Sequence, residues 1–264
     1  MLIYKKIARS TPDLQLKLTQ ARMPDSPEDY VKKNWSTAIF GSFAIIFILF
    51  SFFKSFVVFL LFPIIFFFVF SYFMRFVDVK IKKIKGQIDA EIIFVGRYLL
   101  IELESGVPIY QTFQNIAENY EAVGSYFYEI IDKIDLGTPI EEALNESIQI
   151  APSPNLRKIL WQVLNSFKTG SDIRLSLNIV IDQIVREHQI LAEEYGRKLN
   201  PLAMFYMMMA IIAPSLGVTM LTVLGTFLGL NISLVILLVI VVLVGFVQFM
   251  FLAMIRSSRP PVDV

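Results

Sequence analysis

The sequence lacks cysteine entirely, which excludes disulfide bonds and thiolate-bound metals. It has one histidine, His188, so the two-histidine zinc motif of metalloproteases is also excluded. No glycine is followed by lysine, and the glycine motifs of serine hydrolases and dinucleotide-binding proteins are missing. The acidic residues are spread along the chain rather than gathered in a calcium-binding loop. We therefore expect no enzymatic activity, no cofactor and no bound metal.

Charge is missing from two long stretches of the chain. Lys54 is the one charged residue between Ala38 and Met74, and none occurs between Leu202 and Ile255. About 18 consecutive apolar residues are enough to cross the hydrocarbon core of a membrane. The first stretch divides around Lys54 and the second near Gly229, so the sequence predicts four transmembrane helices. Their expected ranges are 38–53, 56–74, 202–228 and 232–255.

The interiors of the predicted spans also lack ionisable side chains. Ion-coupled transporters and proton pumps usually carry such residues within the membrane. Beyond Ser and Thr, the notable polar side chain in these spans is Gln248. This pattern disfavours a small channel or transporter.

Basic residues flank the predicted spans on one side. Lys and Arg crowd the segment before the first span, follow the second, precede the third and follow the fourth, whereas the connections near Lys54 and Asn231 are almost uncharged. The positive-inside rule then places both termini and the middle domain in the cytoplasm, on a multi-pass plasma-membrane protein. The mostly polar start of the chain does not resemble a cleaved signal peptide. The expected parts are a cytoplasmic segment (1–35), a membrane hairpin (36–74), a cytoplasmic domain (75–200), a second membrane hairpin (201–255) and a cytoplasmic tail (256–264).

The middle domain is predicted to be helical throughout. Its apolar residues recur at helical spacing, as in the stripe Ile88, Ile92, Val95 and Leu99, and no segment alternates long enough to suggest a strand. The fold class is therefore all-α. The six helices expected in this domain cover about 87–105, 108–120, 125–134, 139–149, 154–168 and 172–200.

Three glycines end predicted helices in similar surroundings. Gly106, Gly137 and Gly170 each follow an apolar stripe, where glycine tolerates the left-handed backbone that terminates helices. Pro108 and Pro139 come two residues after the first two glycines, at positions that suit the start of the next helix. An isoleucine follows each of the three glycines at the third position, which suggests stacked helical hairpins. The alternative is that helical bundles generally reuse the same turn chemistry.

Acidic residues gather near two of these turns. Such residues are often just a solvated helix face, but complementary charge also steers assembly with a basic partner. We therefore regard this set as a possible docking surface. Its members are Glu102, Glu104, Glu141, Glu142 and Glu146.

The last helix of the middle domain runs directly toward the third predicted span. Asn200 and Pro201 form the junction, and Pro214 and Gly217 follow within the span. Proline removes a helix hydrogen bond and clashes with the preceding turn, so both sites are predicted hinges. The alternative is that neighbouring helices compensate for the prolines, as they do in many membrane proteins.

Several short motifs, in this order and spacing, resemble the type II secretion system F domain. The run Asn200-Pro201-Leu202 and the segment Pro214-Ser215-Leu216-Gly217 resemble its archaeal and Tad C-type members, as does the layout of two spans, a domain and two spans. The motifs of the domain itself are Ile88-Asp89-Ala90-Glu91-Ile92, Tyr98-Leu99-Leu100, residues 104–109 (ESGVPI), residues 135–144 (DLGTPIEEAL) and residues 168–173 (KTGSDI).

The resemblance implies a cytoplasmic six-helix antiparallel bundle in an inner-membrane platform protein of type IV pilus and type II secretion machines. It implies a hexameric secretion ATPase and pilin subunits as partners, and a role in passing work from ATP hydrolysis to pilin extraction. The classical secretion protein has two such domains; with one, this chain is expected to pair with itself or with a sister subunit in the lipid membrane. A net charge of +1 decides nothing about nucleic acid, and we expect no such partner. The alternative function is a membrane-anchored scaffold or receptor unrelated to filaments.

Overall fold

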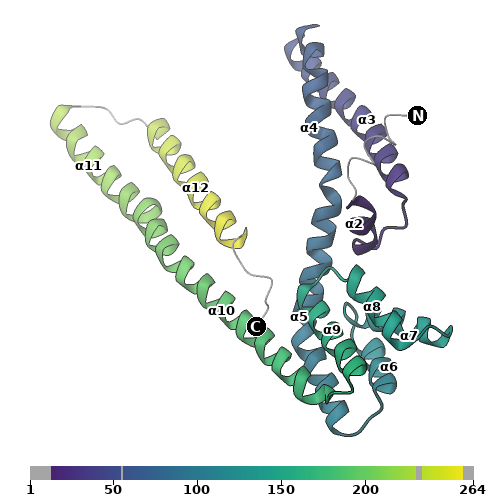
Figure 1. Ribbon diagram of the computed structural model, residues 1–264. Coiled ribbons are helices and arrows are strands. Elements are labelled where there is room, and N and C mark those ends of the chain that lie inside the picture. The colour runs from purple at the N-terminus through teal and green to yellow at the C-terminus, as the bar shows by residue number, and fades with distance from the viewer. Residues whose placement is uncertain (1–12, 55, 230–233, 258–264) are drawn as a thin grey trace. The chain divides into compact units, whose positions relative to one another are not determined.

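The structure is a computed structural model that describes residues 13–54, 56–229 and 234–257. Every regular element in these ranges is a helix, which confirms the predicted all-α class (Figure 1). The chain divides into two compact units, residues 1–181 and 182–264. The long helix α10 (Ile173–Tyr206) begins in the first unit and continues into the second.

The first unit opens with a helical hairpin of strongly apolar sequence. It comprises α2 (Leu14–Gln20), α3 (Pro27–Phe53), the 3₁₀ helix η1 (Phe56–Leu61) and α4 (Phe62–Met74). Helix α3 starts well before the predicted span because Ser26 caps it, accepting a hydrogen bond from the Asp29 N–H, with proline at the first helical position. Its end is marked by Lys54 in the left-handed conformation, at φ 46°. Helices α3 and α4 pack against each other, with Trp35 edge-on to Phe66 and Phe70.

Five helices and the first turns of α10 form the bundle of this unit. They are α5 (Phe76–Glu104), α6 (Ile109–Asn119), α7 (Gly124–Asp135), α8 (Ile140–Ile150) and α9 (Pro154–Thr169). These ranges agree closely with the sequence prediction except for α5, which begins eleven residues before the expected position 87. The apolar stripe marks only the half of α5 that packs in the bundle. The charged half before Ile88 is also helical, and α4 and α5 run on as a nearly continuous rod (Figure 1).

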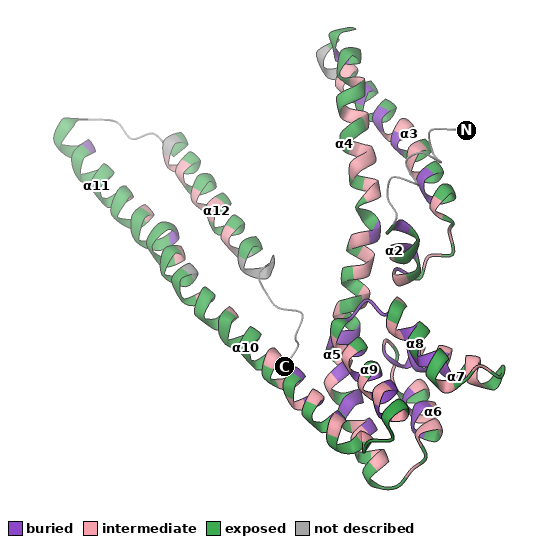
Figure 2. Cartoon of the chain, viewed as in Figure 1, coloured by how far each residue is buried: buried purple, intermediate pink, exposed green. Residues whose placement is uncertain are grey.

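The bundle core lies between α5 and the helices that return beside it. Ile88, Ile92, Val95 and Leu99 are all fully buried, as predicted from their spacing, and buried residues concentrate in α5–α9 in Figure 2. Gly96 lets α10 approach closely, since a β-carbon there would lie 3.0 Å from the Ile181 side chain. Phe113 and Phe127 meet edge to face, with ring centroids 5.0 Å apart.

The glycine turns have the backbone that their sequence predicts. Gly106, Gly137 and Gly170 have φ angles of +83°, +95° and +65°, which side chains with a β-carbon rarely adopt. Pro108 and Pro139 each lie at the N-cap of the following helix.

The second unit contains the rest of α10, a π-helical segment η2 (Met207–Ile212), α11 (Ala213–Leu228) and α12 (Leu234–Ser257). Among the described residues, three helical stretches are long and apolar enough to cross a membrane: Pro27–Ser51, Phe56–Glu104 and Ile173–Leu228. The fourth predicted span corresponds to α12, where the apolar stretch Leu237–Phe251 is shorter. The connection near Asn231 lies outside the described residues.

Candidate functional site

The three glycine turns lie at one end of the bundle, at the end of α5 farthest from α4. The Tyr110 hydroxyl at the start of α6 donates a 2.6 Å hydrogen bond to the Asp135 carboxylate at the end of α7, which brings the first two turns together. Glu104 at the end of α5 acts electrostatically on Arg174 at the start of α10, which adds the third turn. We call this region the distal end; its turns are 105–108, 136–139 and 170–172.

Three of the predicted acids lie beside the glycine turns. Glu104 closes α5, and Glu141 and Glu142 occupy the first turn of α8, where the helix dipole favours negative charge. All three side chains are exposed.

The other two predicted acids bond to neighbouring helices. Glu102 is partly buried and accepts a 3.2 Å hydrogen bond from the Asn115 side chain of α6. Glu146 lies one turn farther along α8, is exposed, and forms an ion pair with Lys133 of α7. Both side chains therefore have a partner within the bundle.

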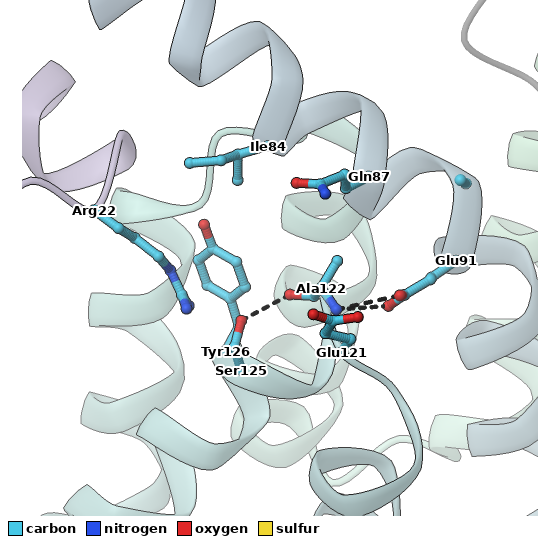
Figure 3. A pocket seen from close by; sticks show the side chains of 9 residues that line it. Arg22, Ile84, Gln87, Glu91, Glu121, Ala122, Ser125 and Tyr126 are labelled. Carbon is cyan, nitrogen blue, oxygen red and sulfur yellow. Dashed lines mark hydrogen bonds between the residues drawn. The ribbon is translucent and has the colours of Figure 1, made fainter.

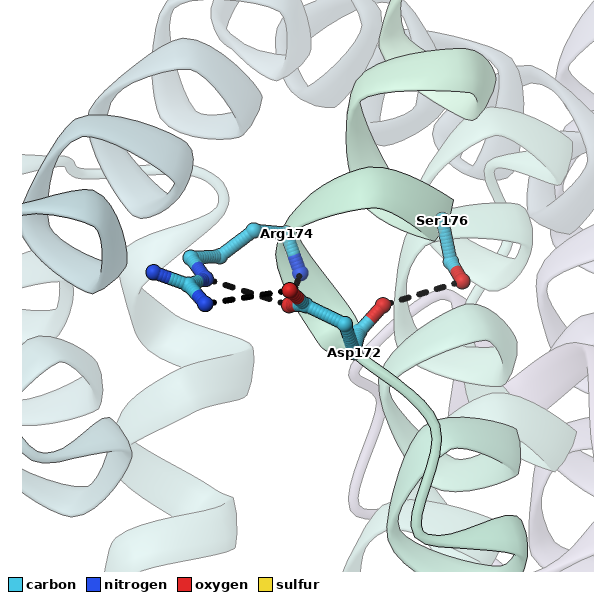
Figure 4. Close-up of polar contacts among 3 residues, drawn as sticks. All are labelled: Asp172, Arg174 and Ser176. Carbon is cyan, nitrogen blue, oxygen red and sulfur yellow. Dashed lines mark hydrogen bonds and ion pairs between the residues drawn. The ribbon is translucent and has the colours of Figure 1, made fainter.

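Asp172 pairs with Arg174 in the third turn. Its carboxylate accepts hydrogen bonds from the Arg174 guanidinium at 3.0 and 3.1 Å and from the Arg174 backbone N–H at 2.9 Å (Figure 4). These bonds lower the pKa of Asp172. The bond to Asp135 raises the pKa of Tyr110, because it favours the protonated phenol.

One large apolar side chain stands out among these acids. Leu136, in the turn after α7, is 79% exposed. A single exposed apolar residue is common on protein surfaces, so its exposure alone does not identify an interface. Sequence reasoning missed Leu136, although its place directly before Gly137 predicts exposure.

Opposite the distal end, two acids of α5 organise the loops between helices. Glu91 accepts hydrogen bonds from the backbone N–H groups of Ala122 (3.1 Å) and Val123 (2.9 Å) at the start of α7. Asp89 accepts a hydrogen bond from Ser153, the N-cap residue of α9. These two acids belong to the Ile88–Ile92 motif of the sequence. Glu91 bonds the backbone before α7, and Asp89 bonds the residue that caps α9.

A polar cavity of about 470 Å³ lies beside Glu91 (Figure 3). The guanidinium of Arg22 lies 4.5 Å from the centre of the Tyr126 ring and forms a 3.0 Å ion pair with Glu129. Burial raises the pKa of Tyr126. Within the ranges that the structure describes, no group of three His, Asp or Glu side chains is placed to hold a metal ion.

The predicted hinge residues lie on one continuous helical element. Asn200 and Pro201 are inside α10, which continues without a break to Tyr206. The departure from α-helical geometry comes later, in the π-helical turn Met207–Ile212, directly before Pro214. There the Ala213 N–H bonds the carbonyl of Met208, five residues earlier. Gly217 lies in the regular part of α11, with open space around it.

A comparison with protein families finds a match that extends from α5 to α11. The family model described as "Type II secretion system (T2SS), protein F" matches residues 97–221. This segment of the chain is therefore similar to the type II secretion system F domain. The match includes the distal end, the π-helical turn and all four predicted hinge residues. No curated protein and no solved structure matches the chain significantly.

F-domain proteins are non-enzymatic platform proteins of the inner membrane, and they work with secretion ATPases and pilins. The geometry of this chain is consistent with such a role. The side chains described above form ion pairs, pack in the core or bond to the backbone. The apolar helices are long enough to cross a membrane. Sequence reasoning found the resemblance to this domain but missed the contacts of Glu91 with the backbone before α7 and of Asp89 with Ser153.

Proposed function

We propose that this chain is a platform subunit of a type IV pilus or type II secretion-like machine, of the Tad C-type with four transmembrane helices. In this role it couples a hexameric cytoplasmic ATPase to the extraction and assembly of pilins. The distal end faces the cytoplasm, and the apolar helices hold the chain in the plasma membrane beside the pilins. With one F domain, the subunit pairs with itself or with a sister subunit.

The single observation that carries the proposal is the match of residues 97–221 to the family model of the type II secretion system F protein. Helix α5 has 29 residues and therefore extends about 43 Å from its junction with α4. The distal end is thus held well away from the membrane, where a soluble ATPase can reach it. Glu104, Glu141 and Glu142 present negative charge to a basic partner surface, and Leu136 offers an apolar anchor.

The membrane side of the proposal rests on the second unit. An apolar groove of about 490 Å³ lies between the η2 region and α12, and Met209, Ala213, Val244 and Val247 are among the residues that line it. Exposed apolar side chains cover α11 and α12 (Figure 2). Such a surface suits lipid and the apolar helix of a pilin equally well.

Gene deletion in the source cell tests the function. We expect surface filaments to disappear, to return when the wild-type chain is supplied, and the ATPase to co-purify with the chain from solubilised membranes. Normal filament numbers after deletion would favour the alternative, a membrane-anchored scaffold or receptor unrelated to filaments.

A further inference from the structure

The junction between α4 and α5 joins the apolar hairpin to the bundle. Helix α4 ends at Met74 and α5 begins at Phe76, with Arg75 between them at φ −76° and ψ −9°. This ψ angle departs from the value of about −42° in an α-helix. Two regular hydrogen bonds still cross the junction, from the Arg75 N–H to Ser71 and from the Val79 N–H to Arg75.

A tyrosine hydroxyl from α3 occupies the middle of this junction. The Tyr30 hydroxyl donates a 3.0 Å hydrogen bond to the carbonyl of Phe73, and it also interacts with the backbone N–H of Val77. In an uninterrupted α-helix this carbonyl and this N–H would bond each other. A side chain inserted into the helical ladder is a recognised cause of helix bending.

The segment before Tyr30 holds the same junction by two further kinds of contact. Lys17 of α2 forms a 2.8 Å ion pair with Asp78 in the first turn of α5. Leu14, Leu18 and Val31 belong to a buried apolar cluster that also contains Val77. Met74 and Ile81, on either side of the junction, pack against this cluster.

We infer that residues 13–31 form a clamp that fixes the angle between α4 and α5 at the interruption around Arg75, with the Tyr30 hydroxyl as its positioning group. The apolar cluster supplies most of the attachment, because it removes large side chains from water. The Lys17–Asp78 pair is partly exposed and contributes little, of order 1 kcal/mol or less. The hydroxyl sets the geometry, because it bonds the Phe73 carbonyl where the helix is interrupted.

This clamp is a property of the chain itself and holds whether or not the proposed partners bind. The N-terminal segment therefore affects the geometry of the α4–α5 junction. If residues 13–31 are released, the Phe73 carbonyl and the Val77 N–H can bond each other. Helices α4 and α5 then either form one straight helix or vary in their relative angle. The clamp thereby controls the angle at which the bundle leaves the membrane.

The test uses electron–electron distance measurements on the full chain in lipid nanodiscs. The sequence has no cysteine, so single labels can be placed at Phe67→Cys on α4 and Arg97→Cys on α5, both exposed positions. A straight helix separates them by about 45 Å. Tyr30→Phe removes the hydroxyl and keeps the buried ring. We expect it to shift the mean distance toward the straight value or to broaden the distribution.

The matched control is Tyr128→Phe, the same change at an exposed position of α7, which should leave the distribution unaltered. Should Tyr30→Phe fail to insert in the membrane, Leu18→Ala weakens the apolar cluster instead and is assessed by the same criterion. Superimposable distributions for the clamp variant and the unmodified chain would overturn the inference. So would an equal change in Tyr128→Phe.

Discussion

The Ser153 hydroxyl donates a 2.5 Å hydrogen bond to the carboxylate of Asp89, 64 positions earlier in the chain. Both side chains are buried, and the same Ser153 oxygen accepts the Leu156 N–H as the N-cap of α9. Asn155 also donates to Asp89, at 3.3 Å. The start of α9 is therefore fixed to the middle of α5 through one carboxylate.

We predict that Asp89→Ala destabilises the bundle by about 1–3 kcal/mol, because it leaves buried polar partners without their acceptor. Thermal unfolding of the solubilised full chain, followed through helical circular dichroism, measures the shift in Tm. Asp132→Ala, at an exposed position of α7, is the matched control and should lie within about 0.5 kcal/mol of the wild type. Equal Tm values for the two variants would mean that the carboxylate is dispensable.

Glu91 should behave as a helix cap supplied from another helix. Glu91→Ala removes the acceptor for the Ala122 and Val123 N–H groups, and losing a cap costs about 1 kcal/mol. Glu91→Gln keeps one carbonyl acceptor and should retain part of the effect. Hydrogen exchange of a peptide covering residues 121–127 should accelerate in the alanine variant and change less in the glutamine variant. Unchanged exchange in both variants would contradict this role.

Docking of the ATPase at the distal end predicts a charge effect. Glu141→Lys combined with Glu142→Lys should weaken co-purification of the ATPase at low salt and leave membrane insertion intact. Exposed charges each contribute about 1 kcal/mol or less, so the double change is needed. Glu193→Lys with Glu194→Lys, an equally exposed acidic pair on α10, is the matched control. If both double variants bind the ATPase like the wild type, the acids are only solvated.

The proposed orientation predicts which positions are accessible from outside the cell. Cysteine at Lys54, an exposed residue between α3 and η1, should react with a membrane-impermeant thiol reagent added to intact cells. Cysteine at Glu118, exposed near the end of α6, should react only after the cells are opened. Labelling of Glu118→Cys in intact cells would reverse the orientation.

The sequence predicts the helices of the bundle well because its turns carry local chemistry. Gly106, Gly137 and Gly170 adopt positive φ, and Ser153 caps α9, so each helix end is encoded within a few residues. Pro139, expected at the start of α8, occupies its N-cap and offers no side-chain hydrogen bond there. Local signals thus predict where helices end more reliably than which side chain caps them.

The contacts that organise the site could not be predicted in this way. Glu91 meets α7, and Tyr30 meets Phe73, across more than 30 intervening positions. The separation of these residues in the sequence does not predict that they meet, because their contact depends on how whole helices pack. The exposed acids at the distal end were found by composition, whereas the roles of Glu102 and Glu146 required their helical neighbours.

The structure shows a polar contact between α12 and the π-helical turn beside Pro214, one of the two predicted hinges. Pro214 has no N–H to offer the carbonyl of Ala210, four residues earlier. The side-chain amide of Gln248 on α12 donates to that carbonyl instead, at 3.4 Å. Gln248 is thus a polar link between α12 and the π-helical turn. Interhelical hydrogen bonds within membranes contribute about 0.6–2 kcal/mol.

We predict that Gln248→Leu destabilises the pairing of α12 with η2 in the wild type and has little effect in Pro214→Ala. Alanine at 214 restores an N–H that can bond Ala210 within its own helix, so the amide is no longer needed. Unfolding of the solubilised chain in the four combinations gives the coupling as a double-mutant cycle. Additive effects would show that the proline and the amide act independently.

The hinge itself is tested by filament assembly. Pro201→Ala combined with Pro214→Ala should stiffen the path from α10 through η2 to α11, since both changes restore a backbone donor to a helix. If bending of this path transmits motion from the bundle to the membrane, expression and ATPase binding stay normal and fewer filaments assemble per cell. Pro201→Ala alone should have the smaller effect, because α10 is already continuous there, whereas the π-helical irregularity lies next to Pro214. Wild-type filament numbers in the double variant would mean that the prolines are accommodated by their neighbours and that motion crosses elsewhere.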